Sequence, residues 1–202
     1  MVARLLDWLG RSIAPENTAI LRSGDLILRS PRPCDHGQWV QLRMASQLFL
    51  QPYEPLWPED DLKPAAWTRR LKRYRRDASL KLGYVWLIWR QTGGEEELVG
   101  GVSLTGVRYG VMQAGTLGYW IGQPFARQAI ATRAVQAVID HAHANLRLSR
   151  IEAATLPDNE ASMGLLRKLG FEQEGLAVDY LRINGRWRDH ALFARTRRNG
   201  GH

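Results

Sequence analysis

The segment 117–133 contains a β-rich run that leads almost directly into a helical pattern of apolar residues. This pattern begins at Ile130 and is the longest of its kind in the chain. A strand that leads into a helix in this way points several free backbone N–H groups, and the positive end of the helix dipole, at one spot. A phosphate or pyrophosphate could be held there without a basic side chain. The Gly-x-Gly-x-x-Gly and P-loop patterns are both missing, so an ordinary strand-to-helix loop remains the alternative.

Hydrophobic periodicity predicts the elements that position this junction. Strands are expected at 26–29, 84–89, 98–107, 116–121 and 150–156, and helices at 35–50, 67–78, 130–146 and 159–169. The strands between 84 and 121 leave no room for a crossover helix, so they form an antiparallel meander, whereas the helix at 130–146 fits a parallel crossover. Asn159 opens and Gly170 ends the last helix, and a final hairpin turns at Asn184-Gly185 in type I′ geometry.

The composition fits a single globular domain, with 202 residues of which 45% are hydrophobic and 24% charged. We expect this domain at 18–195, an arm or short helix at 1–17 and a flexible basic tail at 196–202. No apolar run approaches the roughly 20 residues that cross a bilayer, and the start lacks a convincing cleavage site, so a cytoplasmic protein without membrane contact is expected. The single cysteine, Cys34, and five histidines without ligand spacing predict no metal site.

The chain is basic, with 28 Lys and Arg residues against 20 Asp and Glu and a formal charge of +8. Such a balance favours anionic partners, among them nucleic acid, ribosomes and phosphorylated cofactors. The densest basic cluster is 69–76, on the outer face of the helix expected at 67–78. Two interpretations stay open for it, a solvated helix face or contact with RNA or the ribosome.

The residues from 98 to 194 resemble the GNAT superfamily of acyl-CoA-dependent N-acyltransferases. The segment 126–132 stands where the family has its pyrophosphate loop, and Asn159 starts a helix that ends in Gly170-Phe171, as in the family. Residues 49–55, 117–123 and 184–190 are similar to the subgroup of ribosomal-protein-alanine N-acetyltransferases. The resemblance implies an α+β fold with α/β/α layers, in which helices flank a mixed, mostly antiparallel central sheet.

The resemblance also implies an N-acetyltransferase that uses acetyl-CoA and acetylates an amine by direct attack on the thioester, most simply the N-terminal α-amino group of a ribosomal protein. The residues that it assigns to acetyl-CoA binding are Trp120, Ile121, Gly122, Ala126, Arg127, Gln128, Ala129, Ile130, Ala131, Thr132, Asn159 and Ser162. In this assignment the strand 120–122 offers a backbone N–H to the thioester oxygen, and Asn159 bonds the pantetheine amide. Ser162 protonates or hydrogen-bonds the CoA sulfur, because Leu166 stands where many members carry an acid tyrosine.

The resemblance suggests two carboxylates as general base. Glu54 lies in the loop that would form the amine-binding wall, and Asp179 lies in a strand that would line the acceptor groove, with His190 less favoured. A solvated loop carboxylate and a cross-strand structural contact remain the alternatives for these residues.

Two positions depart from the family pattern. Ala126 stands for the usual Gln or Arg, and Ala129 for the usual middle glycine. An alanine costs little in a right-handed backbone and about 1 kcal/mol if φ is positive. Arg127 and Arg133 could compensate by pairing with phosphates. Two other functions stay open, a GNAT enzyme for a small amine or amino acid and a basic RNA- or ribosome-binding protein without turnover.

Overall fold

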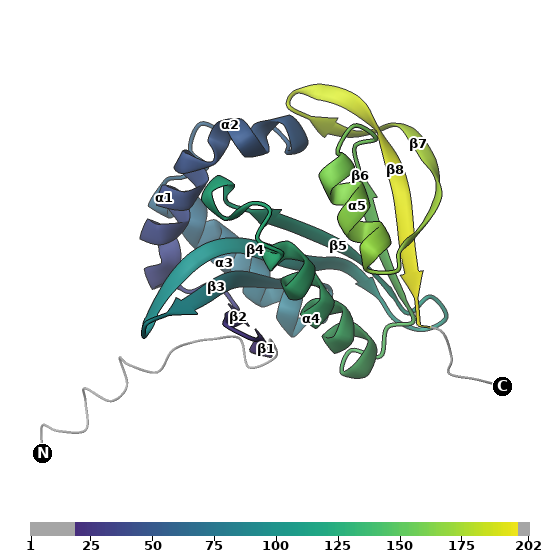
Figure 1. Cartoon of the computed structure of the whole chain (residues 1–202), viewed down its shortest axis with the longest axis horizontal. Helices are drawn as coiled ribbons and strands as arrows, with labels where there is room; N and C mark the ends of the chain where they lie inside the picture. Colours follow the sequence, from purple (N-terminus) through teal and green to yellow (C-terminus); the bar gives the residue numbers. More distant parts are fainter. Residues whose placement is uncertain (1–18, 198–202) are drawn as a thin grey trace, which may run out of the picture.

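The computed structural model describes residues 19–197, which form one eight-stranded sheet in the order β1-β2-β3-β4-β5-β6-β8-β7 (Figure 1). The strands are β1 (Leu21–Ser23), β2 (Leu26–Arg29), β3 (Tyr84–Thr92), β4 (Glu95–Arg108), β5 (Ala114–Ile121), β6 (Arg150–Thr155), β7 (Glu172–Ile183) and β8 (Arg186–Thr196). The α-helices are α1 (His36–Ala45), α2 (Gln47–Leu50), α3 (Pro64–Ser79), α4 (Ile130–Ala144) and α5 (Glu160–Lys168). Short 3₁₀ helices are η1 (Pro33–Asp35), η2 (Gln51–Tyr53) and η3 (Gln123–Phe125).

The sheet opens between the neighbouring strands β5 and β6. These two strands are parallel and are connected by α4, whereas the other neighbouring strands pair antiparallel. The parallel ladder covers only Ala114 to Thr116 on β5. Beyond Thr116 the two strands separate, so their carboxyl ends border an opening. The predicted meander, crossover and mostly antiparallel α+β fold are therefore confirmed.

Helices cover both faces of the sheet. Figure 1 shows α3 behind the strands and α4 in front of them, which confirms the layered arrangement. On α4 the apolar face is fully buried, as Val135, Val138 and Ile139 illustrate, and α3 turns Trp67 and Leu71 inward. This is the pattern that a period of 3.6 residues predicts for helices packed on a sheet.

Caps and turns adopt the predicted conformations. Asn184 and Gly185 have φ angles of 45° and 80°, as a type I′ turn requires. Gly170 follows α5 with a φ of 77°, and the Asn159 side chain accepts a hydrogen bond from the Ser162 N–H at 3.1 Å. Asn159 is therefore the N-cap of α5.

The structure differs from the prediction at three boundaries. The helix expected at 35–50 is interrupted at Ser46, whose backbone leaves the helical region and whose hydroxyl accepts from the Gln123 N–H at 2.9 Å. Strand β1 was not predicted, because three residues are too few to show an alternating pattern. Strand β8 includes Thr196, which the prediction places in the tail. The arm at 1–17 and the last residues of the tail lie outside the described residues. Within residues 19–197, no helix is long and apolar enough to cross a membrane.

Candidate active site

The junction between β5 and α4 presents a run of free backbone N–H groups. Within residues 19–197, no hydrogen bond engages the N–H groups of residues 127 to 132. The flanking N–H groups are used, since Ala126 donates to the Gln123 carbonyl and Arg133 to that of Ala129. These free groups lie at the positive end of the α4 dipole, so the junction can receive an anion such as a pyrophosphate through its backbone alone.

Two residues of this junction have a left-handed backbone. The φ angle is 60° at Arg127 and 57° at Ala129. Left-handed residues that alternate with ordinary ones curl a chain so that successive N–H groups face one concave side, which is a recurrent way to bind anions. Ala129 thus adopts the conformation that a glycine would adopt, at a cost of roughly 1–2 kcal/mol in strain. The alanine lowers stability but leaves the N–H groups in place.

The long side chains near the junction are largely engaged elsewhere. Gln128 donates to the Pro124 carbonyl and accepts from Arg90. Arg133 pairs with Asp25 at 2.5 Å, and this hydrogen bond lowers the pKa of the Asp25 carboxyl. Arg127 is exposed and has no ion pair within the described part of the chain. Of the two arginines expected to help bind phosphates, only Arg127 is available without breaking an existing contact.

The three predicted residues at the end of β5, of which Gly122 directly follows the strand, differ in the availability of their N–H groups. Gly122 donates to the Val99 carbonyl at 2.9 Å, so its N–H cannot serve a thioester oxygen. Hydrogen bonds in an antiparallel pair alternate, and the register of β5 with β4 therefore directs the Trp120 N–H toward β4 and the Ile121 N–H away from it. Ile121 is the member of this set whose N–H faces the opening between β5 and β6.

The first turn of α5 brings Asn159 and Ser162 to the same opening. The Ser162 hydroxyl lies 2.7 Å from the hydroxyl of Tyr119 on β5. Tyr119 is half-buried, and burial raises the pKa of its hydroxyl, which therefore stays protonated at neutral pH. Tyr119 is not among the residues predicted for the site, although it lies inside the motif 117–123 that resembles the family.

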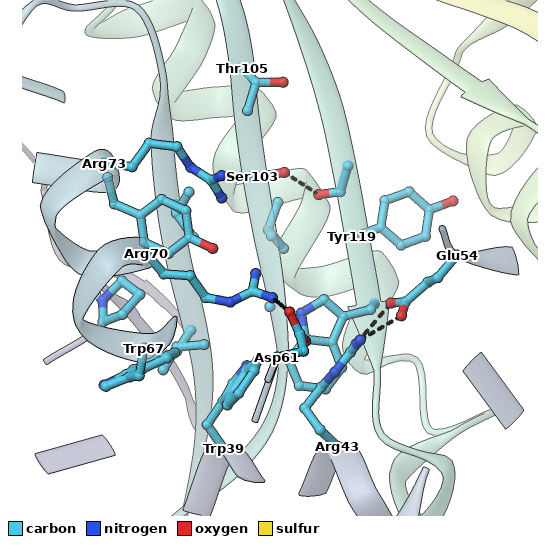
Figure 2. Close-up of a pocket in the computed structure, with 18 of the residues that line it drawn as sticks. Trp39, Arg43, Glu54, Asp61, Trp67, Arg70, Arg73, Ser103, Thr105 and Tyr119 are labelled. Atoms are coloured by element: carbon cyan, nitrogen blue, oxygen red, sulfur yellow. Dashed lines mark hydrogen bonds and ion pairs between the residues drawn. The ribbon is translucent and has the colours of Figure 1, made fainter. Parts of the chain in front are cut away.

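A cavity of about 510 Å³ adjoins Tyr119 on the side of α1 and α3. Figure 2 shows charged side chains from several elements that point into it. The charged residues of its lining are Arg43, Glu54, Asp61, Arg70 and Arg73, and the aromatic ones are Trp39, Trp57, Trp67, Tyr74, Trp86, Tyr119 and Trp120. Tyr119 therefore contributes to the cavity lining and also bonds Ser162, although no residue of α5 lines the cavity itself.

Glu54 is held in this cavity by two donors. Arg43 donates to both of its carboxylate oxygens, at 2.8 and 2.5 Å, and Trp57 donates from its indole N–H at 2.8 Å (Figure 2 shows the Arg43 pair). The Arg43 guanidinium carbon lies 4.1 Å from the Trp57 ring centroid and 5.0 Å from that of Trp120. Such stacking and pairing fix an arginine and its carboxylate in one orientation. Glu54 keeps 21% of its side chain exposed.

The other predicted base is not brought to this cavity. Asp179 is exposed on an irregular stretch of β7, with a φ of 47°, and its N–H donates to an oxygen of Asp189 at 2.9 Å. His190 is buried, and its Nδ1 lies 2.9 Å from the Arg188 carbonyl, so the less favoured histidine has a structural environment. Leu166 is also buried, in the core.

The basic cluster 69–76 is only partly an outer face. Arg69 and Arg70 pair with Asp60 and Asp61, and Arg76 pairs with Asp77 at 3.0 Å. Lys72, Arg73 and Arg75 have no ion pair with any described residue. Arg70 and Arg73 line the cavity, so part of this cluster faces the candidate site and not solvent alone.

Arg43, like Tyr119, was not predicted as a site residue. One signal was available, because Arg43 occupies a position of α1 that is one residue after the buried Leu42 and four after the buried Trp39. An arginine at an inward position of a helix suggests a buried acidic partner. The partner itself could not be read, since Glu54 lies in a loop without a periodic pattern.

Comparison with known proteins identifies the family of this chain. The acetyltransferase (GNAT) domain family matches residues 25–172. The [ribosomal protein uS5]-alanine N-acetyltransferase of Escherichia coli (strain K12) is 33% identical over 176 residues, which cover 87% of this chain and 90% of that protein. No group of His, Cys, Asp and Glu side chains within residues 19–197 could hold a metal ion.

Two solved structures extend the likeness to three dimensions. Mycobacterium smegmatis RimJ in complex with CoA-disulfide superposes with a TM-score of 0.82 at 30% identity, covering 93% of this chain and 90% of that one. The ribosomal-protein-S5-alanine acetyltransferase of Vibrio fischeri gives a TM-score of 0.83 at 28% identity, covering 92% and 100%. The family match and this similarity along both chains show that the protein belongs to the GNAT family of acetyltransferases.

Proposed function

We propose that this acetyltransferase transfers an acetyl group from acetyl-CoA to the N-terminal α-amino group of a ribosomal protein. The observation that carries the proposal is the 33% identity to a ribosomal-protein-alanine N-acetyltransferase along 87% of the chain. A match of that length extends over both halves of the sheet, so it is not confined to the half that would bind a coenzyme. A ribosomal acceptor would place the reaction in the cytoplasm.

The residues around the opening fit acetyl-CoA, which supplies the acetyl group as a thioester. The free N–H groups of 127–132 would hold its pyrophosphate at the start of α4. Asn159 uses its side-chain oxygen to cap α5, which leaves its amide N–H₂ for the pantetheine. The Ile121 N–H would receive the thioester oxygen, because a donor fixed before the reaction stabilises the charge that develops there. Ser162 would hydrogen-bond the sulfur.

The cavity beside Tyr119 would receive the acceptor amine. A carboxylate has about four positions for hydrogen bonds, and Arg43 and Trp57 occupy three of them on Glu54. The remaining position would accept from the amine and draw its proton away, with Asp179 as the alternative base. An α-amino group has a pKa of about 7.7–8.0, against about 10.4 for lysine, so a peptide N-terminus needs only a weak base near pH 7.

The proposal is tested with purified protein, acetyl-CoA and peptides that begin with alanine, by following the release of free thiol. We expect release that depends on the peptide and stops when its N-terminus is already acetylated. Replacing Ser162 by alanine should lower kcat by about tenfold or more, since it removes a hydrogen bond to a developing charge. Absence of both thiol release and a thermal shift with acetyl-CoA would dispose of the proposal.

Two other outcomes would redirect the proposal without removing the enzyme class. Thiol release with free amino acids or small amines, but not with peptides, would make the acceptor a small molecule. We further propose that α3 contacts ribosomal RNA through Lys72, Arg73 and Arg75, because acidic residues already neutralise Arg69, Arg70 and Arg76. RNA affinity without acetyl transfer would favour a binding protein on a GNAT scaffold.

A further inference from the structure

Tyr119 and Ser162 are joined by a hydrogen bond across the opening of the sheet. Their hydroxyl oxygens are 2.7 Å apart, and the bond connects β5 to the first turn of α5 beyond the point where β5 and β6 separate. Among the residues that the structure describes, the Ser162 hydroxyl has no other hydrogen-bond partner. Ser162 is therefore held by one side-chain hydrogen bond, and its hydroxyl is not engaged by any other described residue.

The direction of this bond follows from the two hydroxyl groups. The geometry allows either hydroxyl to donate, and the Tyr119 hydroxyl also lies 3.4 Å from the Ser162 carbonyl. Because a phenol is a far stronger acid than an aliphatic alcohol, we assign Tyr119 as the donor to the Ser162 hydroxyl. Burial raises the pKa of Tyr119, which keeps the donor protonated. A hydroxyl that accepts one hydrogen bond becomes a better donor for the next, because the two bonds polarise each other. The Ser162 proton is thus free for a second acceptor.

We propose that Tyr119 is a positioning residue that directs the Ser162 proton toward the sulfur of acetyl-CoA. The inference rests on the proposed function, in which Ser162 faces that sulfur. A serine in the first turns of a helix otherwise tends to donate to a backbone carbonyl of the preceding turn. The Tyr119 hydroxyl acts against that rotation by offering Ser162 a donor from β5. It acts through Ser162 and makes no contact of its own with the sulfur.

The first experiment compares the wild type with Tyr119→Phe, Ser162→Ala, the double variant and a control in steady-state kinetics. Tyr119→Phe keeps the ring and should lower kcat by about tenfold, with a KM for acetyl-CoA within about twofold of the wild type. In a Ser162→Ala background the same substitution should change kcat by less than about twofold, since the residue through which it acts is gone. Tyr109→Phe is the matched control, because it removes a tyrosine hydroxyl that bonds Tyr84 outside the cavity lining.

The second experiment needs no turnover. Calorimetry with CoA and with desulfo-CoA between pH 7 and 9 separates contacts to the sulfur from the rest of the coenzyme. Near the thiol pKa of about 8.5 the wild type should bind CoA more tightly as the thiolate forms, because a directed hydroxyl stabilises the anion. Tyr119→Phe should lose most of that rise, and its affinity for desulfo-CoA should equal that of the wild type.

Three results would overturn the inference. The first is that Tyr119→Phe has the same kcat as the wild type and the same pH dependence of CoA binding. Another is an undiminished effect of Tyr119→Phe in the Ser162→Ala background, and the third is a loss of desulfo-CoA affinity as large as the loss for CoA. A wild-type protein that binds neither compound would contradict the proposed function, and this inference with it.

Discussion

Ala129 combines a demanding backbone conformation with a side chain that does not favour it. Its φ of 57° belongs to the region where glycine is at ease and alanine is strained. The residue sits between free N–H groups, so its conformation determines where those groups point. The strain lowers the stability of the fold, while the geometry of the proposed pyrophosphate site is retained.

Replacing Ala129 by glycine should raise the free energy of unfolding by about 0.5–1 kcal/mol. The substitution removes about 1–2 kcal/mol of strain and adds about 0.5–1 kcal/mol of chain entropy in the unfolded state. Ala126→Gly is the matched control, because Ala126 has an ordinary extended backbone with φ −63° and ψ 152°. The control should lower stability in urea denaturation by about 0.5–1 kcal/mol. Equal losses in both variants would show that Ala129 is not strained.

The Ala129→Gly variant also shows how the alanine side chain affects the affinity for CoA. Because Ala129 already has the conformation of a glycine, we expect Ala129→Gly to change the Kd for CoA by less than about threefold. Titration calorimetry provides the measurement, with Ala126→Gly again as the control. A gain of about tenfold or more would mean that the added methyl group obstructs the pyrophosphate.

Glu54 has a structural role and a proposed chemical role, which two variants can separate. Glu54→Gln removes the counter-charge of Arg43, whose side chain is only 8% exposed, and should destabilise the protein by about 3 kcal/mol. Adding Arg43→Met removes the uncompensated charge and should restore most of the stability. We expect kcat/KM for the peptide to stay at least about tenfold low in both variants, since the group that accepts from the amine is missing. Recovery of activity in the double variant would make Glu54 purely structural.

The contact between Gly122, which directly follows β5, and α1 links the opening of the sheet to the proposed acceptor cavity. A Cβ added to Gly122 would lie 2.3 Å from Cδ1 and 2.9 Å from Cγ of Leu42. Gly122 is therefore required for close packing, and its N–H is engaged with β4. Because Arg43 follows Leu42 on α1, this packing also sets the place of the Arg43–Glu54 pair.

Gly122→Ala should lower the free energy of unfolding by about 1–3 kcal/mol, as overpacking does in a filled core. Combining it with Leu42→Ala should give a loss smaller than the sum of the two single losses, because the smaller side chain makes room for the added methyl group. Gly164→Ala is a control, since a Cβ there meets nothing within 4 Å inside α5, and it should raise stability by about 0.5–1 kcal/mol. Additive losses in the double variant would contradict this packing argument.

Elements with a long periodic pattern could be predicted from the sequence, and contacts between distant residues could not. The pattern of α4 indicates its buried face, and Asn159 and Gly170 indicate the ends of α5. The bond between Tyr119 and Ser162 joins residues that are 43 positions apart, and no local pattern reports such a contact. The positive φ of Ala129 was equally hidden, because alanine favours a right-handed backbone.

At the scale of the whole molecule, the net charge of +8 does not show how many positive side chains are free of ion pairs in a given region. On α3 the acidic neighbours Asp60, Asp61 and Asp77 neutralise part of the cluster 69–76. Exposed ion pairs contribute little to stability, but they reduce the charge that a polyanion meets. Any RNA contact by this face would depend on the residues outside these pairs.

The salt dependence of RNA binding tests this count of available charges. If Lys72, Arg73 and Arg75 alone contact phosphates, log K against log salt should have a slope of about −2 on single-stranded RNA, and about −4 if the whole cluster takes part. Lys72→Ala should make the slope shallower by about 0.7, since one phosphate contact disappears. Arg69→Ala removes a residue already paired with Asp60 and should leave the slope almost unchanged. An equal effect of both variants would show that the ion pairs open when RNA binds, and the face would then act as a uniformly basic surface.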